Sequence, residues 1–187
     1  VVGVATATTM VCGEGVKLCG VLTLESGLGP GAYEHDAVTC HGLWPETGSY
    51  GTSACLAPGD KADPDVIYPC YAGSGGDVVS FEVHEWEKHG ECAGVADEAD
   101  YFDQVCALAQ TPVAIMTSVR TRGGDLDAMA SAVAAAGYEI FEVDAANGQL
   151  LLSACAGPDT RWTLAAEADF AATCGGWADD DDDDDDD

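Results

Sequence analysis

The chain has few basic residues and no long apolar run. Six lysines and arginines stand against 34 aspartates and glutamates in 187 residues, which gives a formal net charge of −28. Proteins that bind nucleic acids usually carry the opposite charge, so the composition by itself argues against a nucleic-acid substrate. No stretch approaches the roughly 18 consecutive apolar residues of a membrane-spanning helix, and we therefore expect no membrane partner.

The chain also lacks closely spaced cysteine pairs. It has nine cysteines, but the shortest interval, from Cys12 to Cys19, is longer than the Cys-x-x-Cys spacing typical of zinc sites. Disulfides are the better interpretation, and they indicate a secreted or vacuolar protein. The odd count leaves at least one thiol unpaired within the chain. Because the sequence opens on Val1-Val2-Gly3 with no basic segment, we expect any signal peptide to have been removed.

The length suits one domain, which we expect to span residues 1–177. The remaining segment, 178–187, contains the run Asp179–Asp187 and cannot bury apolar surface, so a disordered tail is predicted. Without those nine charges the net charge is still −19.

Strands and helices are both indicated, in mixed order. Strand patterns occur at Val21–Leu24, Ala37–Leu43, Tyr138–Asp144, Gln149–Ala156 and Arg161–Leu164. Helix patterns occur at Ser80–Cys92, Asp97–Gln110, from Pro112 to Gly123, and at Leu126–Ala136. Asn147-Gly148 predicts a hairpin between two of the strands. The order favours an α+β fold with a largely antiparallel sheet flanked by helices and stabilised by disulfides.

Two short segments hold three of the four histidines. They read CHGLWPE at Cys40–Glu46 and FEVHEWEKHGEC at Phe81–Cys92. Cleaving RNA through its own 2′-hydroxyl needs a base for that proton and an acid for the departing 5′-oxygen, and histidine suits both tasks. A lysine can stabilise the charge that builds on the phosphoryl group. This inventory is supplied by His41, His84, Glu85, Lys88 and His89.

Other interpretations of these residues stay open. A zinc site would use two histidines at i and i+4, whereas His84 and His89 are at i and i+5, roughly 140° apart on a helix. The isolated His35 is interpreted as structural. Trp44 and Trp86 could both be core aromatics, and for Trp86 that interpretation is preferred.

At these two segments the chain resembles the T2 family of secreted ribonucleases. His41-Gly-Leu-Trp-Pro and His84-Glu-Trp-x-Lys-His-Gly-x-Cys are similar to the two active-site segments of that family, in the same order. The resemblance implies that His41 is the general acid and His89 the general base of the transfer step. It also implies that His84 binds phosphate, and that Glu85 and Lys88 stabilise the transition state.

The resemblance extends to the substrate and the reaction. It implies base contacts from Trp44, Glu46 and Phe81, and with less support from Tyr50. The implied activity is a metal-independent endoribonuclease of broad base specificity, with no cofactor, that cleaves single-stranded RNA but not DNA. The products are 2′,3′-cyclic phosphates and then 3′-phosphates. We expect a monomer.

Disulfide pairings follow from the same resemblance. It implies the bridges Cys12–Cys19, Cys55–Cys92 and Cys155–Cys174. Of the remaining cysteines, Cys40 is expected to pair with Cys106 and to leave Cys70 free.

Two further functions remain possible at this stage. The acidic composition favours a non-catalytic relative that serves storage or partner binding, or else an enzyme adapted to high salt. The acidic surroundings also predict a raised His89 pKa, because negative charge favours protonated imidazole.

Overall fold

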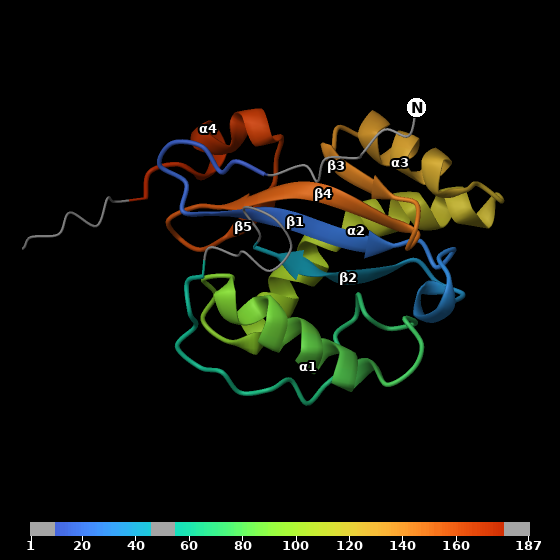
Figure 1. The fold of residues 1–187 in the computed structure, drawn as a ribbon, viewed down its shortest axis with the longest axis horizontal. Helices are drawn as coiled ribbons and strands as arrows, with labels where there is room; N and C mark the ends of the chain where they lie inside the picture. Colours follow the sequence, from blue (N-terminus) through green and yellow to red (C-terminus); the bar gives the residue numbers. More distant parts are fainter. Residues whose placement is uncertain (1–9, 46–54, 178–187) are drawn as a thin grey trace, which may run out of the picture.

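The structure is a computed structural model that describes residues 10–45 and 55–177. In this part of the chain an antiparallel sheet has the order β2-β1-β4-β3, and β5 pairs with β4 (Figure 1). The strands are β1 Leu18–Glu25, β2 Thr39–Trp44, β3 Ile140–Asp144, β4 Gln149–Ala156 and β5 Trp162–Leu164. The long strands β1 and β4 form its centre.

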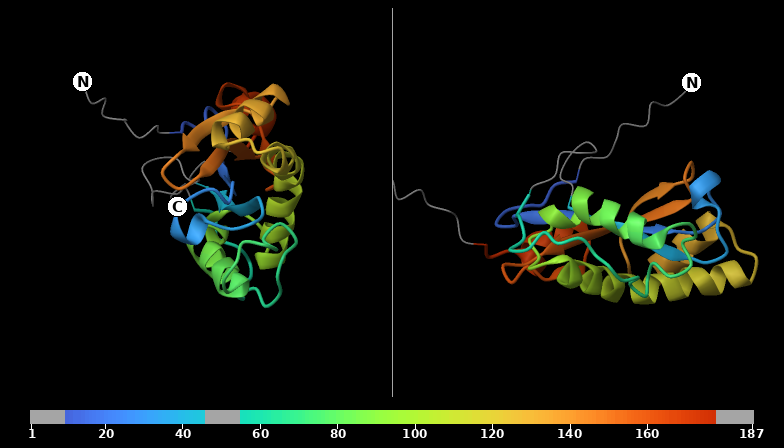
Figure 2. Two further views of the ribbon diagram at one scale, coloured as in Figure 1. Left: turned by 90° about the vertical axis from the view of Figure 1, so that its right-hand side faces the viewer. Right: turned by 90° about the horizontal axis from the view of Figure 1, so that it is seen from below.

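Helices flank the sheet, so the predicted α+β class is confirmed. The α-helices are α1 Val78–Lys88, α2 Glu98–Thr121, α3 Leu126–Ala135 and α4 Phe170–Cys174. Short 3₁₀ turns occupy η1 Gly31–Tyr33, η2 Gly90–Cys92 and η3 Glu167–Asp169. The long helix α2 runs behind the sheet, and α1 lies beyond its β2 edge (Figures 1 and 2).

The alternation of side chains along β1 places its last residue on a defined face. Leu22 and Leu24 pack into the larger core, whereas Val21 points to the opposite face with Phe170 of α4. Because strand residues alternate, Glu25 shares the face of Val21. Glu25 is buried at this position, and β1 is paired on both sides there, with β2 and with β4.

A tyrosine on α2 fixes β2 against the core. Tyr101 is fully buried, and its hydroxyl donates to the Leu43 carbonyl at 2.9 Å and accepts from the Leu43 N–H at 3.2 Å. Both backbone groups of Leu43 are thereby satisfied from the helix side. The strand that carries the first histidine segment is therefore held in place from behind.

The predicted helix break at Pro112 is wrong. Helix α2 runs without interruption from Glu98 to Thr121, with Pro112 inside it. A proline there removes one backbone hydrogen bond and crowds the preceding turn. Pro112 is itself buried, and Ala109 and Met116 continue the same buried face on either side. Packing of that face outweighs the local cost of the proline.

Four disulfides join eight of the nine cysteines, and one of the expected pairings is wrong. The bridges are Cys12–Cys19, Cys55–Cys92, Cys70–Cys106 and Cys155–Cys174. The first, second and fourth match the pairs that the resemblance implied. The error is at Cys106, which bonds to Cys70 and leaves Cys40 as the free, buried thiol. The Cys70 carbonyl accepts from the Cys40 N–H at 3.0 Å, so the Cys70 turn covers the edge of β2 and lies between Cys40 and α2.

Some predictions fall outside the described residues. Glu46 and Tyr50 do so, as does the tail 178–187, so the proposed domain boundary stays a prediction. None of the helices in the described ranges has both the length and the apolar character needed to cross a membrane.

Candidate active site

His41 sits at an irregularity in the pairing of β1 and β2. Thr23 pairs with Gly42 and Leu24 with Cys40, so His41 is the extra residue of a β-bulge. A bulge breaks the regular alternation and re-aims a side chain. Cys40 remains in the core while the His41 ring turns towards α1, where its centroid lies 5.0 Å from that of Phe81.

Helix α1 presents the second segment to this ring. It begins at the N-cap Asp77, whose side chain accepts from the Ser80 N–H. Phe81, Glu85 and Lys88 lie four and three residues apart and so share one face. Glu85 is buried and Phe81 half-buried, whereas His84 and Lys88 are exposed at the rim of the cluster. Their exposed nitrogen atoms can donate to a phosphate that approaches from solvent.

Glu85 is the buried centre of the cluster. Its side chain is 1% exposed, Oε1 lies 3.3 Å from Nε2 of His41, and Oε2 accepts from Nε1 of Trp44 at 3.0 Å. This approach requires Gly42, because a Cβ at that position would overlap the Glu85 carboxylate. The glycine that follows the histidine in the first segment is therefore explained by a side chain of the second.

His89 lies just beyond the end of α1. The predicted helix Ser80–Cys92 is divided: α1 ends at Lys88, His89 is the C-cap with φ −130° and ψ −48°, and η2 follows. The angle calculated for an unbroken helix therefore does not apply to His89. Its buried ring stacks on Trp44, with centroids 5.1 Å apart and planes 25° apart. The Trp44 ring also contacts His41 edge-on, with the two ring centroids 5.1 Å apart.

Behind His41 lies a second carboxylate that the sequence analysis missed. Glu25 at the end of β1 places Oε1 2.7 Å from Nδ1 of His41 and Oε2 2.7 Å from Nε2 of His35. Gln149, opposite Glu25 on β4, brings its side-chain amide to 2.7 Å from the same Nδ1. The signal for Glu25 was an acidic residue that ends an otherwise apolar strand, and no pattern in the sequence pointed to Gln149.

The two central histidines have opposite electrostatic environments. Burial by itself would lower the pKa of His41, but its hydrogen bonds to Glu25 and Glu85, together with their charges, raise the pKa from 6.5 to about 9. Burial is the largest influence on His89 and lowers its pKa to about 4; Glu85 acts to raise the pKa, and the charges of His41, His84 and Lys88 act to lower it. The expected rise of the His89 pKa is therefore wrong, because burial of the ring decides the shift and the overall charge does not.

The structure brings most of the predicted site residues in the described ranges together. His41, Trp44, Phe81, Glu85 and His89 form one contiguous cluster, with His84 and Lys88 beside it on α1. Trp86 is fully buried in the core, as preferred. His35, interpreted as structural, contacts Glu25, and the other carboxylate oxygen of Glu25 contacts His41. Within the described residues, no three histidine, cysteine or acidic side chains are arranged to hold a metal ion.

Known proteins share features of this chain. A model of the ribonuclease T2 family matches residues 11–119. "Ribonuclease 3" of Arabidopsis thaliana is 33% identical over 81 residues, which cover 37% of this chain and 36% of that protein. The chain thus spans little more than a third of the length of this curated relative.

Two solved structures are similar at low identity. A variant of RNase MC1 in complex with 5′-UMP is 21% identical, with a TM-score of 0.47 over 81% of this chain and 92% of that chain. Actibind, described as a T2 ribonuclease, is 20% identical, with a TM-score of 0.45 over 81% of each chain. The family match spans more than half of the chain and includes both histidine segments, and the chain therefore belongs to the ribonuclease T2 family.

Proposed function

We propose that this chain is an endoribonuclease that cleaves single-stranded RNA by transphosphorylation, with His89 as general base and His41 as general acid. The observation that carries the proposal is the placement of both rings against Trp44, each with its centroid 5.1 Å from that of the tryptophan. Their pKa values are displaced in opposite directions, to about 4 for His89 and about 9 for His41. Between these values His89 is neutral and can accept a proton, while His41 is charged and can donate one. Groups whose pKa values are pushed apart in this way are suited to acid and base roles.

The proposed transfer step uses both histidines at once. Neutral His89 takes the proton of the 2′-hydroxyl, and the 2′-oxygen attacks phosphorus. The bond from phosphorus to the 5′-oxygen breaks, and His41 gives its proton to that oxygen. Lys88 and His84 at the rim neutralise the phosphate, and Glu85 orients the donors between them. The products are a 2′,3′-cyclic phosphate and a free 5′-hydroxyl.

Base recognition is proposed to be broad. Phe81 is half-buried beside His41, and Trp44 is half-buried between the two histidines. Aromatic rings of this kind stack on bases with little regard to sequence. Glu46 and Tyr50 remain proposed contacts in the segment after β2. The reaction needs no metal or cofactor, and the enzyme is proposed to be a secreted or vacuolar monomer.

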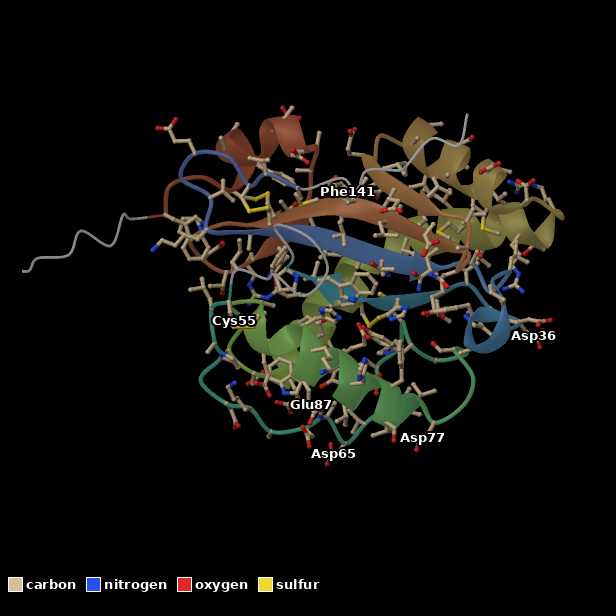
Figure 3. All side chains as sticks on the ribbon, in the orientation of Figure 1. Asp36, Cys55, Asp65, Asp77, Glu87 and Phe141 are labelled. Carbon is tan, nitrogen blue, oxygen red and sulfur yellow. A yellow bond between two sulfur atoms is a disulfide. The ribbon has the colours of Figure 1, made fainter. Side chains whose placement is uncertain are left out.

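The decisive experiment is digestion of single-stranded RNA in EDTA, with 2′-deoxy substrate in parallel. Wild-type protein is expected to cut RNA only, because DNA lacks the nucleophile. His41→Phe and His89→Phe are each expected to lose about 100-fold or more of kcat/KM. Glu87→Gln, at an exposed position of α1 (Figure 3), is the matched control and should retain activity. Cleavage of DNA, or more than about a tenth of wild-type activity in either histidine variant, would exclude the mechanism.

One observation favours a second function. The net charge of −28 opposes binding of a polyanion, which suits a non-catalytic relative that serves storage or partner binding. A folded wild-type protein that leaves RNA intact at all salt concentrations would support that alternative.

A further inference from the structure

A chain of three side chains, His35–Glu25–His41, lies behind the proposed active site. Each oxygen of the Glu25 carboxylate contacts one histidine at 2.7 Å. All three side chains are nearly excluded from solvent, with exposures of 5%, 6% and 11% for His35, Glu25 and His41. The transfer step described above does not use Glu25 or His35.

The carboxylate contacts of His41 fit one protonation state. Nδ1 of His41 faces Glu25, and its Nε2 faces Glu85. Carboxylate oxygens accept hydrogen bonds but do not donate them, so His41 donates to both only as an imidazolium with both nitrogens protonated. On the other side of Glu25, Nε2 of His35 faces the carboxylate, and its Nδ1 lies 2.8 Å from the Ala37 carbonyl oxygen.

Gln149 is a further polar group at the same ring nitrogen. Its side-chain Nε2 lies 2.7 Å from Nδ1 of His41. An amide N–H donates and does not accept, so Gln149 bonds to a protonated Nδ1 only when the amide turns its oxygen towards the ring. The buried Gln149 thus offers an alternative partner but no charge that could replace that of Glu25.

The surrounding backbone holds this chain of side chains in place. Glu25 pairs with Thr39 of β2 on one side and with Gln149 of β4 on the other. Arg120 of α2 donates to the carbonyl oxygens of Ser26 and His35, at 3.0 and 2.7 Å. It thereby connects the segment that carries Glu25 to the segment that carries His35. The Glu25 carboxylate is therefore fixed before any substrate arrives.

We propose that Glu25, braced by His35, is a positioning residue that fixes His41 as a proton donor and thereby favours RNA transfer over hydrolysis of the cyclic phosphate. This inference rests on the proposed function. It assigns to Glu25 a role distinct from that of Glu85: Glu25 contacts Nδ1 of His41, whereas Glu85 contacts Nε2, the nitrogen that donates in the proposed transfer step.

The preference follows from the proton balance of the two steps. In the transfer step His41 starts protonated and ends neutral. In hydrolysis, His41 must start neutral: it takes a proton from water, the water oxygen attacks phosphorus, the bond from phosphorus to the 2′-oxygen breaks, and His89 protonates that oxygen. A fixed carboxylate at Nδ1 stabilises the starting state of the first step and destabilises that of the second.

The groups that face His41 come from every element around it. They are Tyr33 of η1, Glu25 of β1, His35 before β2, Cys40 beside His41, and Glu85 and His89 at the end of α1. Burial and the two carboxylates raise the pKa of Cys40, so its thiol adds no charge. The charges acting on His89 are those of Glu85, His41, His84 and Lys88. Glu85 thus acts on both histidines, and Glu25 on His41.

The first test is the pH profile of kcat/KM for Glu25→Gln on single-stranded RNA. The alkaline limb is expected to fall by about one pH unit or more, the usual effect of losing an adjacent opposite charge, while the acid limb stays in place. Asp36→Asn is the matched control, because Asp36 is exposed beside His35 and its loss changes the net charge equally (Figure 3). An alkaline limb that moves no further in Glu25→Gln than in Asp36→Asn overturns the proposal.

The second test compares the two steps directly. Hydrolysis of 2′,3′-cyclic CMP, relative to RNA transfer at pH 7, should rise about tenfold in Glu25→Gln for each pH unit that the limb falls, because more His41 is neutral. An unchanged ratio overturns the proposal, since a purely structural loss would slow both steps together.

A third measurement needs neither the Glu25→Gln variant nor enzymatic activity. ¹⁵N NMR of the wild-type histidines at pH 7, with the His41 signals identified by their loss in His41→Phe, should show both His41 nitrogens protonated. A neutral His41 ring overturns the role of Glu25. If the wild-type protein cuts no RNA but His41 is an imidazolium, the proposed function is wrong, whereas the conclusion that Glu25 keeps His41 protonated is retained.

Discussion

Nε2 of His41 lies 3.3 Å from Oε1 of Glu85. The nitrogen that donates in the proposed mechanism is thus already paired with a carboxylate in the free site. The second oxygen of Glu85 is held by Trp44, whose ring also stacks on His89. A substrate phosphate that contacts His41 must therefore compete with Glu85, and the same carboxylate influences both histidines.

Glu85→Gln should shift both limbs of the pH profile to lower pH. The Glu85 carboxylate raises the pKa of His41 and of His89, so its loss lowers both. The loss of kcat should be smaller than in His89→Phe, because the residue moves no essential proton. Glu82→Gln is the control: Glu82 is equally buried on α1 but accepts from the Tyr68 N–H at 2.7 Å. Both limbs of the Glu82→Gln profile should coincide with those of the wild-type protein. If only one limb moved in Glu85→Gln, Glu85 would not act on both histidines.

The wild-type pH profile should be a broad bell. The dependence of kcat/KM reports the free enzyme. Its acid limb is expected near the His89 pKa of about 4 and its alkaline limb near the His41 pKa of about 9. Stopped digestions of a short RNA in buffers of constant ionic strength would measure it. A narrow bell with both limbs close to 6.5, the ordinary histidine value, would show that burial and the carboxylates do not set these pKa values.

Stability should depend on pH through the same two groups, in opposite directions. Between about 4 and 6.5 the unfolded chain protonates His89 and the folded chain does not, so this contribution is present above 6.5 and is lost as pH falls. Between 6.5 and about 9 the folded chain holds a proton on His41 that the unfolded chain has released, so that contribution is lost as pH rises. The pair together favours maximal stability near pH 6.5.

Melting temperatures across this range would test the assignment. His41→Phe should remove part of the alkaline decline, and His89→Phe part of the acid decline. The other carboxylates titrate in all three proteins, so the differences from wild type isolate each histidine. A His41→Phe curve that parallels the wild-type curve from pH 6.5 to 9 would contradict the raised pKa.

The sequence predicted the fold where local patterns are strong. The hairpin at Asn147-Gly148 and the start of a helix at Asp97 depend on neighbouring residues only, and both are present. The helix break predicted at Pro112 was wrong because a proline disturbs the helix locally, whereas the packing that offsets this disturbance is tertiary. The Cys40–Cys106 pairing failed for a similar reason, since the position of Cys70 depends on a turn that covers the edge of β2.

The sequence predicted only those site residues that lie in the two histidine segments. His41, Glu85 and His89 stand in recognisable motifs, so their proximity could be expected. Glu25 and Gln149 enter from β1 and β4, and only the strand register and the bulge at His41 bring them to its Nδ1. The pKa of His89 failed as a prediction because net charge describes the whole surface, whereas a buried ring responds to its own neighbours.

The last prediction concerns salt, because the overall charge opposes the substrate. A basic protein loses affinity for RNA as salt rises, since salt competes with its phosphate contacts. Here a chain of net charge −28 approaches a polyanion, so screening should assist association. The Debye length falls from roughly 30 Å at 0.01 M salt to about 10 Å at 0.1 M. Over that range kcat/KM on single-stranded RNA should rise, and it should fall at higher salt as contacts to Lys88 and the histidines weaken.

Deleting Asp179–Asp187 separates the tail from the body. The deletion removes nine charges and leaves −19, so it should raise activity most at low salt and little at high salt. The matched control replaces the nine aspartates with asparagines, which removes the charge but keeps the length. If the asparagine variant follows the deletion, charge repulsion explains the effect, and if it follows wild type, chain length does. Wild-type and deleted proteins whose kcat/KM falls in parallel from 0.01 to about 0.3 M salt would show that long-range repulsion does not limit association.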